Sequence, residues 1–302
     1  MDKTVLIIED EAEQAEGLRK SLSTALPDVI FESYSGKNEI LYAIEHRFYS
    51  LAIVDIRMDK YDIDGLALIK NIISINPFAK IIVVSAYTEE YFQKLSEILL
   101  SGRVVGILHK VKFAEFSAQL ARTIAEYFSQ LEQDPSEVNN ALLQYYAEAK
   151  NELDAFKKGL RFERFISLLF GSFGYKEINK RVKDQSLNEV DLIVRNETDD
   201  TFLTKFGKYI LIECKNYPDR KVNKNDFILF NNKVKNTNGL AELGVFATSG
   251  HITWNTYVEA IRESNEAPKI IFMSNPEIEA IIRASDKREA FKRLIDAQVK
   301  DN

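Results

Sequence analysis

The stretch LAIVDIRM, residues 51–58, is apolar over four residues and then places Asp55 inside the same run. Runs that are apolar on both strand faces are typical of a parallel sheet covered on both sides. An acid in such a strand needs a partner, because burying an unpaired charge is costly. The stretch therefore predicts a buried parallel strand that carries a polar site near its end.

Four further β-rich runs surround this stretch within residues 1–128. Amphipathic helical patterns lie between them, for instance over residues 11–25 and 65–75. Five Val- and Ile-rich strands alternating with helices predict a doubly wound α/β domain with a five-stranded parallel sheet. The predicted strands are residues 4–9, 30–35, 51–56, 80–86 and 104–110.

Polar residues gather at the ends of these predicted strands. In a parallel sheet the carboxyl ends of the strands meet at one edge. Converging carboxylates suit a hard divalent cation such as Mg²⁺, and a carboxylate beside that cation can act as a nucleophile toward phosphorus. Capping of the next helix would explain the three acids after the first strand, but not Asp55. The polar residues are Glu9, Asp10, Glu11, Asp55, Ser85 and Lys110.

With these residues, together with Ala86 after Ser85, residues 1–128 resemble the receiver domain of two-component response regulators. The resemblance implies that Asp55 accepts a phosphoryl group from a sensor histidine kinase or another phosphoryl donor. It also implies a Mg²⁺ ion held by Asp10, Asp55 and the backbone carbonyl of Arg57, with Glu9 assisting. The phosphoryl oxygens would be contacted by Ser85 and Lys110. The loop at residues 58–65, MDKYDIDG, is longer than is usual in that family.

Residues 129–160 are predicted to form a helical linker. Residues 129–137, SQLEQDPSE, interrupt the preceding pattern and place Pro135 near the start of a new helix. The stripe of apolar residues that follows indicates a helix that packs on its own chain or on a second copy in a homodimer. The stripe consists of Val138, Leu142, Tyr145, Ala149, Leu153, Phe156 and Leu160.

Residues 161–302 return to an α/β pattern and predict a second domain with a mixed sheet. This domain begins with a helix, RFERFISLLFGSFGY, at residues 161–175. The predicted strands are residues 189–194, 208–214, 243–249 and 269–274, and further helices are predicted at residues 224–235, 253–263 and 286–300.

The stretch LIECKNY, residues 211–217, places Glu213 and Lys215 two positions apart in a predicted strand. Residues two apart share one strand face, so Cys214 points the other way. If the preceding strand pairs with this one, Asp191 approaches Glu213. Two carboxylates and a lysine at one sheet edge suit Mg²⁺-assisted phosphodiester hydrolysis. A surface Glu–Lys pair is the alternative, and ECK by itself favours it.

The sequence on both sides of this stretch favours the catalytic site over the surface pair. The ordered stretches FERFISLLFGSFGY, EVDLIV, ILIECKNY and LGVFATSGHIT, over about residues 160–275, resemble the Mrr-type restriction endonuclease domain of the D…(D/E)xK nuclease superfamily. The resemblance implies Mg²⁺ held by Asp191 and Glu213, catalysis by Lys215, and Glu163 completing the site from the first helix. It also implies DNA as the substrate.

Together the two resemblances predict a phosphorylation-responsive, Mg²⁺-dependent DNA endonuclease, in which a homodimer would cut both strands. One alternative is a response regulator whose second domain binds DNA or a partner protein without cutting. Another is a first domain that serves as a dimerisation platform without phosphorylation.

Several smaller features carry weaker expectations. Four lysines near the second site are either a solvated face or phosphate contacts. Tyr217 could touch a base or sugar, whereas Trp254 is expected in the core or between a helix and the sheet. His109 and His251 lack partner spacing and receive no role. The four lysines are Lys221, Lys224, Lys233 and Lys235.

Composition limits the class of protein. Hydrophobic residues make up 45% and charged residues 28%, as in ordinary soluble globular proteins. No apolar run approaches about 18 residues, so no membrane span is expected, and the start of the chain lacks a signal-peptide pattern. The single Cys214 fits a reducing cytoplasm. The net charge of -6 is concentrated in residues 1–128, so DNA would meet the second half.

Overall fold

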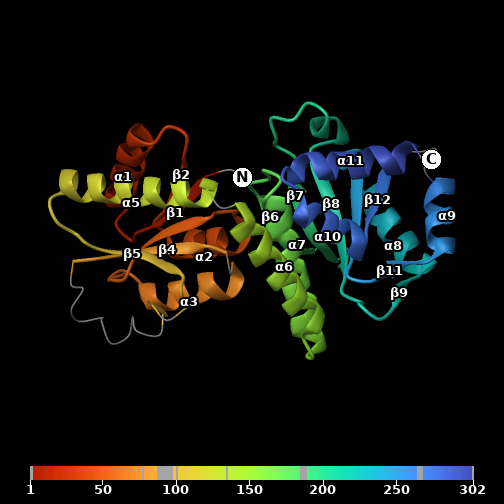
Figure 1. The fold of residues 1–302 in the computed structure, drawn as a ribbon, viewed down its shortest axis with the longest axis horizontal. Helices are drawn as coiled ribbons and strands as arrows, with labels where there is room; N and C mark the ends of the chain where they lie inside the picture. The colour runs from red at the N-terminus through yellow and green to blue at the C-terminus, as the bar shows by residue number, and fades with distance from the viewer. Residues whose placement is uncertain are drawn as a thin grey trace. The chain divides into compact units, whose positions relative to one another are not determined.

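The computed structural model describes residues 3–76, 78–86, 98–99, 101–133, 135–183, 189–263 and 268–300. The chain forms two compact units, Asp2–Val138 and Asn139–Asn302. Each unit has its own sheet and its own helices (Figure 1). None of the described helices is long and apolar enough to cross a membrane.

The first unit is a five-stranded parallel sheet in the order β2-β1-β3-β4-β5, flanked by helices. The predicted fold class is confirmed, and every predicted strand of this unit is present. The strands are β1 (Thr4–Ile8), β2 (Ile30–Tyr34), β3 (Leu51–Asp55), β4 (Lys80–Ser85) and β5 (Val104–His109). The helices with full bounds are α1 (Ala12–Ala25), α2 (Lys37–His46), α3 (Gly65–Ile75) and α5 (Phe113–Gln133).

The central strand β3 explains why the strands are apolar on both faces. Its residues alternate between two hydrophobic clusters, with Ala52 and Val54 in the cluster under α2 and α3. Leu51 and Ile53 belong to the cluster under α1 and α5. Burying an aliphatic side chain contributes about 1.5–3 kcal/mol, so two covered faces outweigh the cost of the acid at the strand end.

The second unit contains a mixed five-stranded sheet in the order β12-β10-β8-β7-β6. Strands β8, β10 and β12 are parallel, whereas β7 runs antiparallel to both β6 and β8. The mixed sheet is therefore confirmed. Its strands are β6 (Ile178–Lys183), β7 (Glu189–Arg195), β8 (Tyr209–Lys215), β10 (Leu243–Thr248) and β12 (Lys269–Met273), and β9 (Lys221–Val222) pairs with β11 (His251–Ile252). The helices are α6 (Pro135–Asn151), α7 (Ala155–Gly171), α8 (Lys224–Lys235), α9 (Trp254–Glu263), α10 (Asn275–Arg283), α11 (Lys287–Lys300) and the 3₁₀ helix η1 (Leu203–Phe206).

The single apolar stripe predicted for the helical linker is wrong, because two helices occupy that part of the chain. Helix α6 ends at Asn151, and α7 begins after Asp154, whose carboxylate accepts a hydrogen bond from the Lys157 N–H at 2.8 Å. That cap starts a new helix in a new direction. Leu153 and Phe156 are consequently 97% and 67% exposed, so the buried stripe covers α6 alone.

The large aromatic residues are divided between the core and the surface. Tyr146, Phe162 and Phe165 stack in the core between α6 and α7. Trp254 does not lie in the core, since 73% of its surface is exposed at the start of α9. A helix-to-sheet contact was expected because large aromatic residues usually bury most of their area.

Gly65, at the start of α3, has no room for a side chain. A Cβ there would lie 2.0 Å from the backbone oxygen of Asp55 and 2.6 Å from the Cα of Ile56. We expect Gly65→Ala to lower the free energy of unfolding by about 1–3 kcal/mol, because backbone must move to relieve the overlap. Urea unfolding of the full chain measures this change.

Gly17→Ala is the matched control. Its Cβ would meet the Phe113 ring at an ordinary 3.7 Å, and Ala in a helix interior is favoured over Gly by about 0.5–1 kcal/mol. This variant should be slightly more stable than the parent. Equal stability of the two variants would show that α3 does not pack this tightly against the end of β3.

Candidate functional sites

Three buried carboxylates meet at the carboxyl end of the first sheet. Glu9 and Asp10 follow β1, and Asp55 ends β3, the neighbouring strand. Among the described residues, these three offer carboxylate oxygens that all lie within 4.8 Å of one another. All three residues are at most 5% exposed. Such a set of oxygen donors fits a hard divalent cation.

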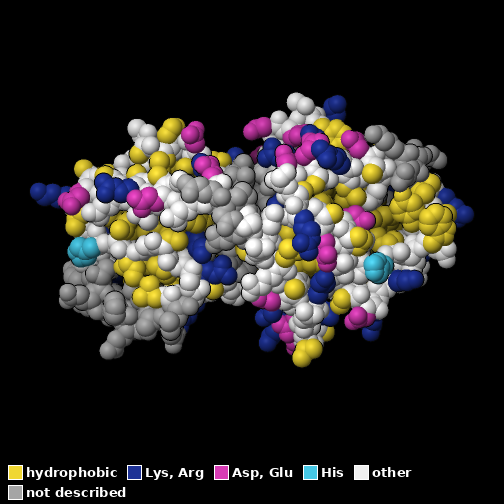
Figure 2. All heavy atoms as spheres, in the orientation of Figure 1, with side chains coloured by type: hydrophobic (Ala, Val, Ile, Leu, Met, Phe, Trp, Pro, Cys, Tyr) yellow, Lys and Arg dark blue, Asp and Glu magenta, His cyan; other side chains and the backbone are white. Residues whose placement is uncertain are grey.

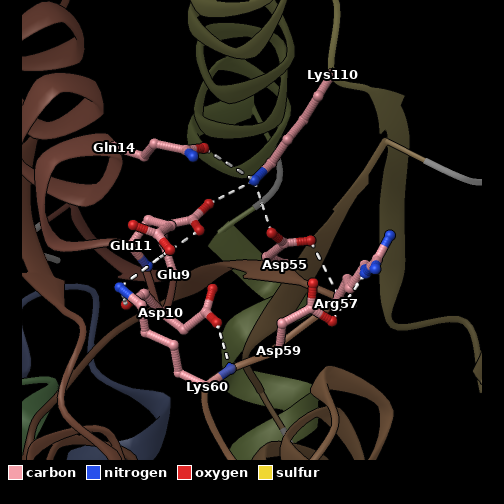
Figure 3. A network of polar contacts seen from close by, with 9 residues as sticks. All are labelled: Glu9, Asp10, Glu11, Gln14, Asp55, Arg57, Asp59, Lys60 and Lys110. Carbon is pink, nitrogen blue, oxygen red and sulfur yellow. Dashed lines mark hydrogen bonds and ion pairs between the residues drawn. The ribbon is translucent and has the colours of Figure 1, made fainter.

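Lys110 compensates part of this negative charge. Lys110 follows β5, and its Nζ donates to Glu9 Oε2 and to Asp55 Oδ2, each at 2.6 Å (Figure 3). Desolvation opposes the charged lysine, but the bonds to both acids outweigh it and raise its pKa. Burial raises the pKa of Glu9 to about 7 even though Lys110 lowers it. The site therefore holds more buried negative charge than one ammonium group neutralises.

Backbone groups of the longer loop complete one side of this site. The Arg57 N–H donates to Asp55 Oδ1 at 3.1 Å, and the Lys60 N–H donates to Asp10 Oδ2 at 3.0 Å (Figure 3). The Lys60 ammonium pairs with Glu11 at 3.0 Å. The loop after β3 thus folds back over the acidic residues.

Ser85 also reaches this edge of the sheet. It ends β4 and is fully buried, and its backbone oxygen accepts a hydrogen bond from the Lys110 N–H at 2.9 Å. The register pairs Asp55 with Val84, so Ser85 lies one residue beyond the acid on the adjacent strand. The residues predicted for the first site therefore lie at one edge of the sheet. Arg57, predicted to offer its backbone carbonyl to Mg²⁺, here donates its backbone N–H to Asp55, and the role of its carbonyl stays a prediction.

The second site forms where β7 and β8 pair. The antiparallel register aligns Leu192 with Ile212, which brings Asp191 opposite Glu213. Asp191 Oδ2 accepts a hydrogen bond from the Cys214 N–H at 2.7 Å, and Lys215 Nζ pairs with Glu213 Oε1 at 2.7 Å. The two acids and the lysine predicted for this site are brought together.

Glu163 approaches the same place from α7. Its carboxylate accepts hydrogen bonds from the Arg181 guanidinium at 2.8 and 3.3 Å. Burial first, and then the charges of Glu213 and Glu163, raise the pKa of Asp191 to about 7. These three acids thus act on one another electrostatically, as a shared site requires.

Lys233 belongs to the second site but was weighed only as a surface or phosphate-contacting lysine. Its Nζ donates to Glu213 Oε2 at 2.9 Å and to the Glu189 backbone oxygen at 2.8 Å. Glu213 is therefore held between two ammonium groups. The helical spacing could have placed it, since Lys233 lies three residues after the buried Phe230 and so on the inner side of α8.

Asp191 and Glu213 offer two carboxylates at the second site, whereas the described residues place three acids within 4.8 Å of one another only at the first site. Within the described part of the chain, no group donates to Asp191 Oδ1. Asp191 is half-buried, and desolvation first and then the charge of Glu213 raise its pKa to about 7, so a bound cation would favour its ionised form. The other predicted lysines differ from one another, because Lys224 pairs with Glu259 at 2.9 Å while Lys221 is exposed.

Asp191 should make stability depend on pH in the absence of metal. Its pKa of about 7 in the folded chain exceeds its ordinary value of 3.8, so the folded state is favoured while Asp191 stays protonated. That stabilisation is complete below about pH 4 and is lost as pH rises to about 7. We expect Asp191→Asn, which stays neutral, to flatten this loss in urea unfolding across the range. Identical pH profiles for both proteins would contradict it.

Comparisons with known proteins agree with both halves of this description. The family model of the response regulator receiver domain matches residues 5–113, and a restriction endonuclease model, Mrr_cat, matches residues 155–282. No curated protein matches the chain.

Solved structures resemble the first unit. A CheY-like receiver domain protein from Methanospirillum hungatei JF-1 is 23% identical, with 44% of this chain and 99% of that one covered and a TM-score of 0.37. The response regulator TrrA from Thermotoga maritima is 25% identical, with coverages of 40% and 98% and a TM-score of 0.32. The fold of the first unit is established by its strand order and not by these two similarities. The chain joins a response regulator receiver domain to a restriction-endonuclease-like domain.

Proposed function

We propose that the chain is a phosphorylation-responsive, Mg²⁺-dependent DNA endonuclease. The observation that carries the proposal is the meeting of Asp191, Glu213 and Lys215 on paired strands, with Glu163 close enough to shift the pKa of Asp191. A surface Glu–Lys pair would not explain a Glu213 that is 6% exposed and lies opposite Asp191 on the paired strand. Such groups are arranged for chemistry more often than for stability.

Each residue of this site has a part in phosphodiester hydrolysis. Asp191 and Glu213 would hold Mg²⁺, which when bound polarises a phosphate oxygen and lowers the pKa of a bound water. Lys215, at 2.7 Å from Glu213, carries the charge that stabilises the pentacovalent phosphorus. Lys233 fixes the other oxygen of Glu213, so the rotamer of this acid is set from α8.

The receiver site supports control by phosphorylation. The Asp55 carboxylate would attack the phosphorus of a phosphohistidine on a sensor kinase, or of another phosphoryl donor, forming an acyl phosphate while the bond to the donor breaks and the imidazole or other leaving group departs. Lys110 already lies 2.6 Å from Asp55 Oδ2 and can follow the added phosphoryl group, beside the buried Ser85. Mg²⁺ would be held by Asp10, Asp55 and the Arg57 backbone. Homodimerisation would place two nuclease sites on one duplex and allow a double-strand break.

One observation favours the alternative of a domain that binds DNA or a partner protein without cutting. Both oxygens of Glu213 carry an ammonium partner, Lys215 and Lys233. A cation at Glu213 therefore competes with two lysines. A protein that binds only should bind DNA equally well with and without Mg²⁺, whereas the endonuclease requires the ion for turnover.

Lys215→Ala should lower Mg²⁺-dependent plasmid cleavage by about a hundredfold or more, because it removes a preorganised charge from the transition state. The control is Lys205→Ala, which removes an exposed lysine on η1 and should cut like the parent. Cleavage is measured with and without acetyl phosphate. A Lys215→Ala protein that cuts at the parent rate would show that the active site is elsewhere.

Asp55→Asn should abolish phosphoryl labelling by radioactive acetyl phosphate, because the nucleophilic oxygen is lost. Asp59→Asn is the control, since Asp59 is exposed and pairs with Arg57 on the same loop. This variant should label like the parent. Absence of label on the parent would favour a first domain that works without phosphorylation.

A further inference from the structure

A surface pocket lies beside Trp254 in the second unit, apart from the residues of the nuclease site. Its volume is about 380 Å³, and its lining includes His251, Thr253, Trp254, Tyr257, Phe272 and Gln298. The rings of Trp254 and Tyr257 lie 5.9 Å apart, and Tyr257 lies 6.2 Å from Phe272. Hydrophobic side chains gather over α9 on the molecular surface (Figure 2). Single exposed apolar residues are ordinary, but Trp254 is 73% exposed at an open pocket and is backed by Tyr257 and the buried Phe272, so its indole face is available to a ligand.

In the residues that the structure describes, some polar side chains around the pocket have hydrogen-bond partners within the protein, and others do not. The Gln298 amide is fully engaged, because it accepts from the Phe272 N–H at 2.8 Å and donates to the Phe272 carbonyl at 2.7 Å. Glu277 is also engaged, since it accepts from the Ser274 N–H at 3.0 Å and caps α10. These contacts hold the floor of the pocket in one shape.

Of the described side chains near the pocket, those without a partner are basic or neutral. Strands β9 and β11 pair Lys221 with His251, so these two exposed residues lie side by side. Among the described residues, neither side chain has an ion pair or a hydrogen bond. A lysine and an imidazole near an exposed indole offer charge to a phosphate, and the indole offers a flat face to a base.

The pocket is built on the same frame as the nuclease site. Thr248 pairs with Lys215 in the parallel register of β10 and β8. His251 follows Thr248 by three residues, a span of at most about 10 Å. The connecting segments are locked, because a Cβ on Gly250 would lie 2.1 Å from the Tyr217 carbonyl oxygen. A nucleic-acid strand that binds in the pocket is therefore also positioned at the nuclease site.

We propose that this pocket binds an unpaired base of the DNA strand, with Trp254 stacking on the base and Lys221 and His251 contacting the adjacent phosphate. The DNA strand follows from the proposed function, whereas the stacking site stands on the pocket itself. An exposed indole can stack only on a base that has left the duplex or was never paired. The pocket would select substrates with single-stranded or distorted DNA near the cleavage point.

Trp254 is the only tryptophan of the chain, so its fluorescence reports directly on the pocket. The full chain is titrated in EDTA with single-stranded oligothymidylate, with an abasic oligomer of the same length, and with thymidine monophosphate. We expect oligothymidylate to quench the emission and the abasic oligomer to leave it unchanged. Equal quenching by the abasic oligomer would overturn base stacking. Equally tight binding of the monophosphate would overturn the assignment to a strand.

Variants then test the energetics by anisotropy of labelled oligothymidylate. Trp254→Ala should weaken binding by about 5-fold to 100-fold, the range of one base–aromatic stack. Trp254→Phe should restore most of the affinity. Leu229→Ala removes an exposed apolar side chain of α8 and should bind like the parent. Equal affinities of Trp254→Ala and Leu229→Ala would overturn the proposal.

This experiment separates the pocket from the nuclease proposal. A parent protein that quenches but never cuts DNA contradicts the endonuclease and leaves the pocket supported. A protein that cuts without quenching contradicts the pocket alone. A chain that docks another protein at Trp254 would show no quenching by any oligomer.

Discussion

Buried carboxylates held in place by lysine ammonium groups are the constraint on which both halves of the structure depend. Lys110 lies between Glu9 and Asp55, and Lys215 and Lys233 flank Glu213. Breaking such a pair by removing one partner leaves an uncompensated buried charge, which is strongly destabilising. Even so, the pKa values of Glu9 and Asp191 rise to about 7. Among the described residues, the set of three acids whose oxygens lie within 4.8 Å of one another is the one in the first unit.

The two units reach this arrangement by different topologies. In the first, parallel strands end at one edge, so residues distant in sequence meet whatever the connecting lengths are. In the second, the acids come from an antiparallel pair, and register decides the outcome. A shift by one residue would place Asp191 and Glu213 on opposite faces of the sheet. Buried apolar residues of the two strands, such as Leu192 in β7 and Ile212 in β8, keep that register.

Sequence reasoning recovered the sheet strands with continuous Val and Ile runs, because burial on both faces leaves a pattern in the residues themselves. It missed β6, INKRVK, since four of its six residues are polar and its role is to present Arg181 to Glu163. It joined α6 to α7, because apolar residues continue at helical spacing through Leu153 while the Asp154 cap turns the chain. The contact of Lys233 and the exposure of Trp254 depend on packing between distant elements, which no local spacing encodes.

Asp191 does two things at once, and this limits how the domain can change over evolution. Its carboxylate accepts the hydrogen bond of the Cys214 N–H. Cys214 lies just past Ile212, where the backbone pairing of β7 with β8 ends. The side chain cannot be discarded freely whatever the domain does, since an apolar replacement would leave the Cys214 amide without an acceptor. Asparagine keeps the acceptor and removes the charge, so relatives that vary at this position should carry Asn there more readily than Ala.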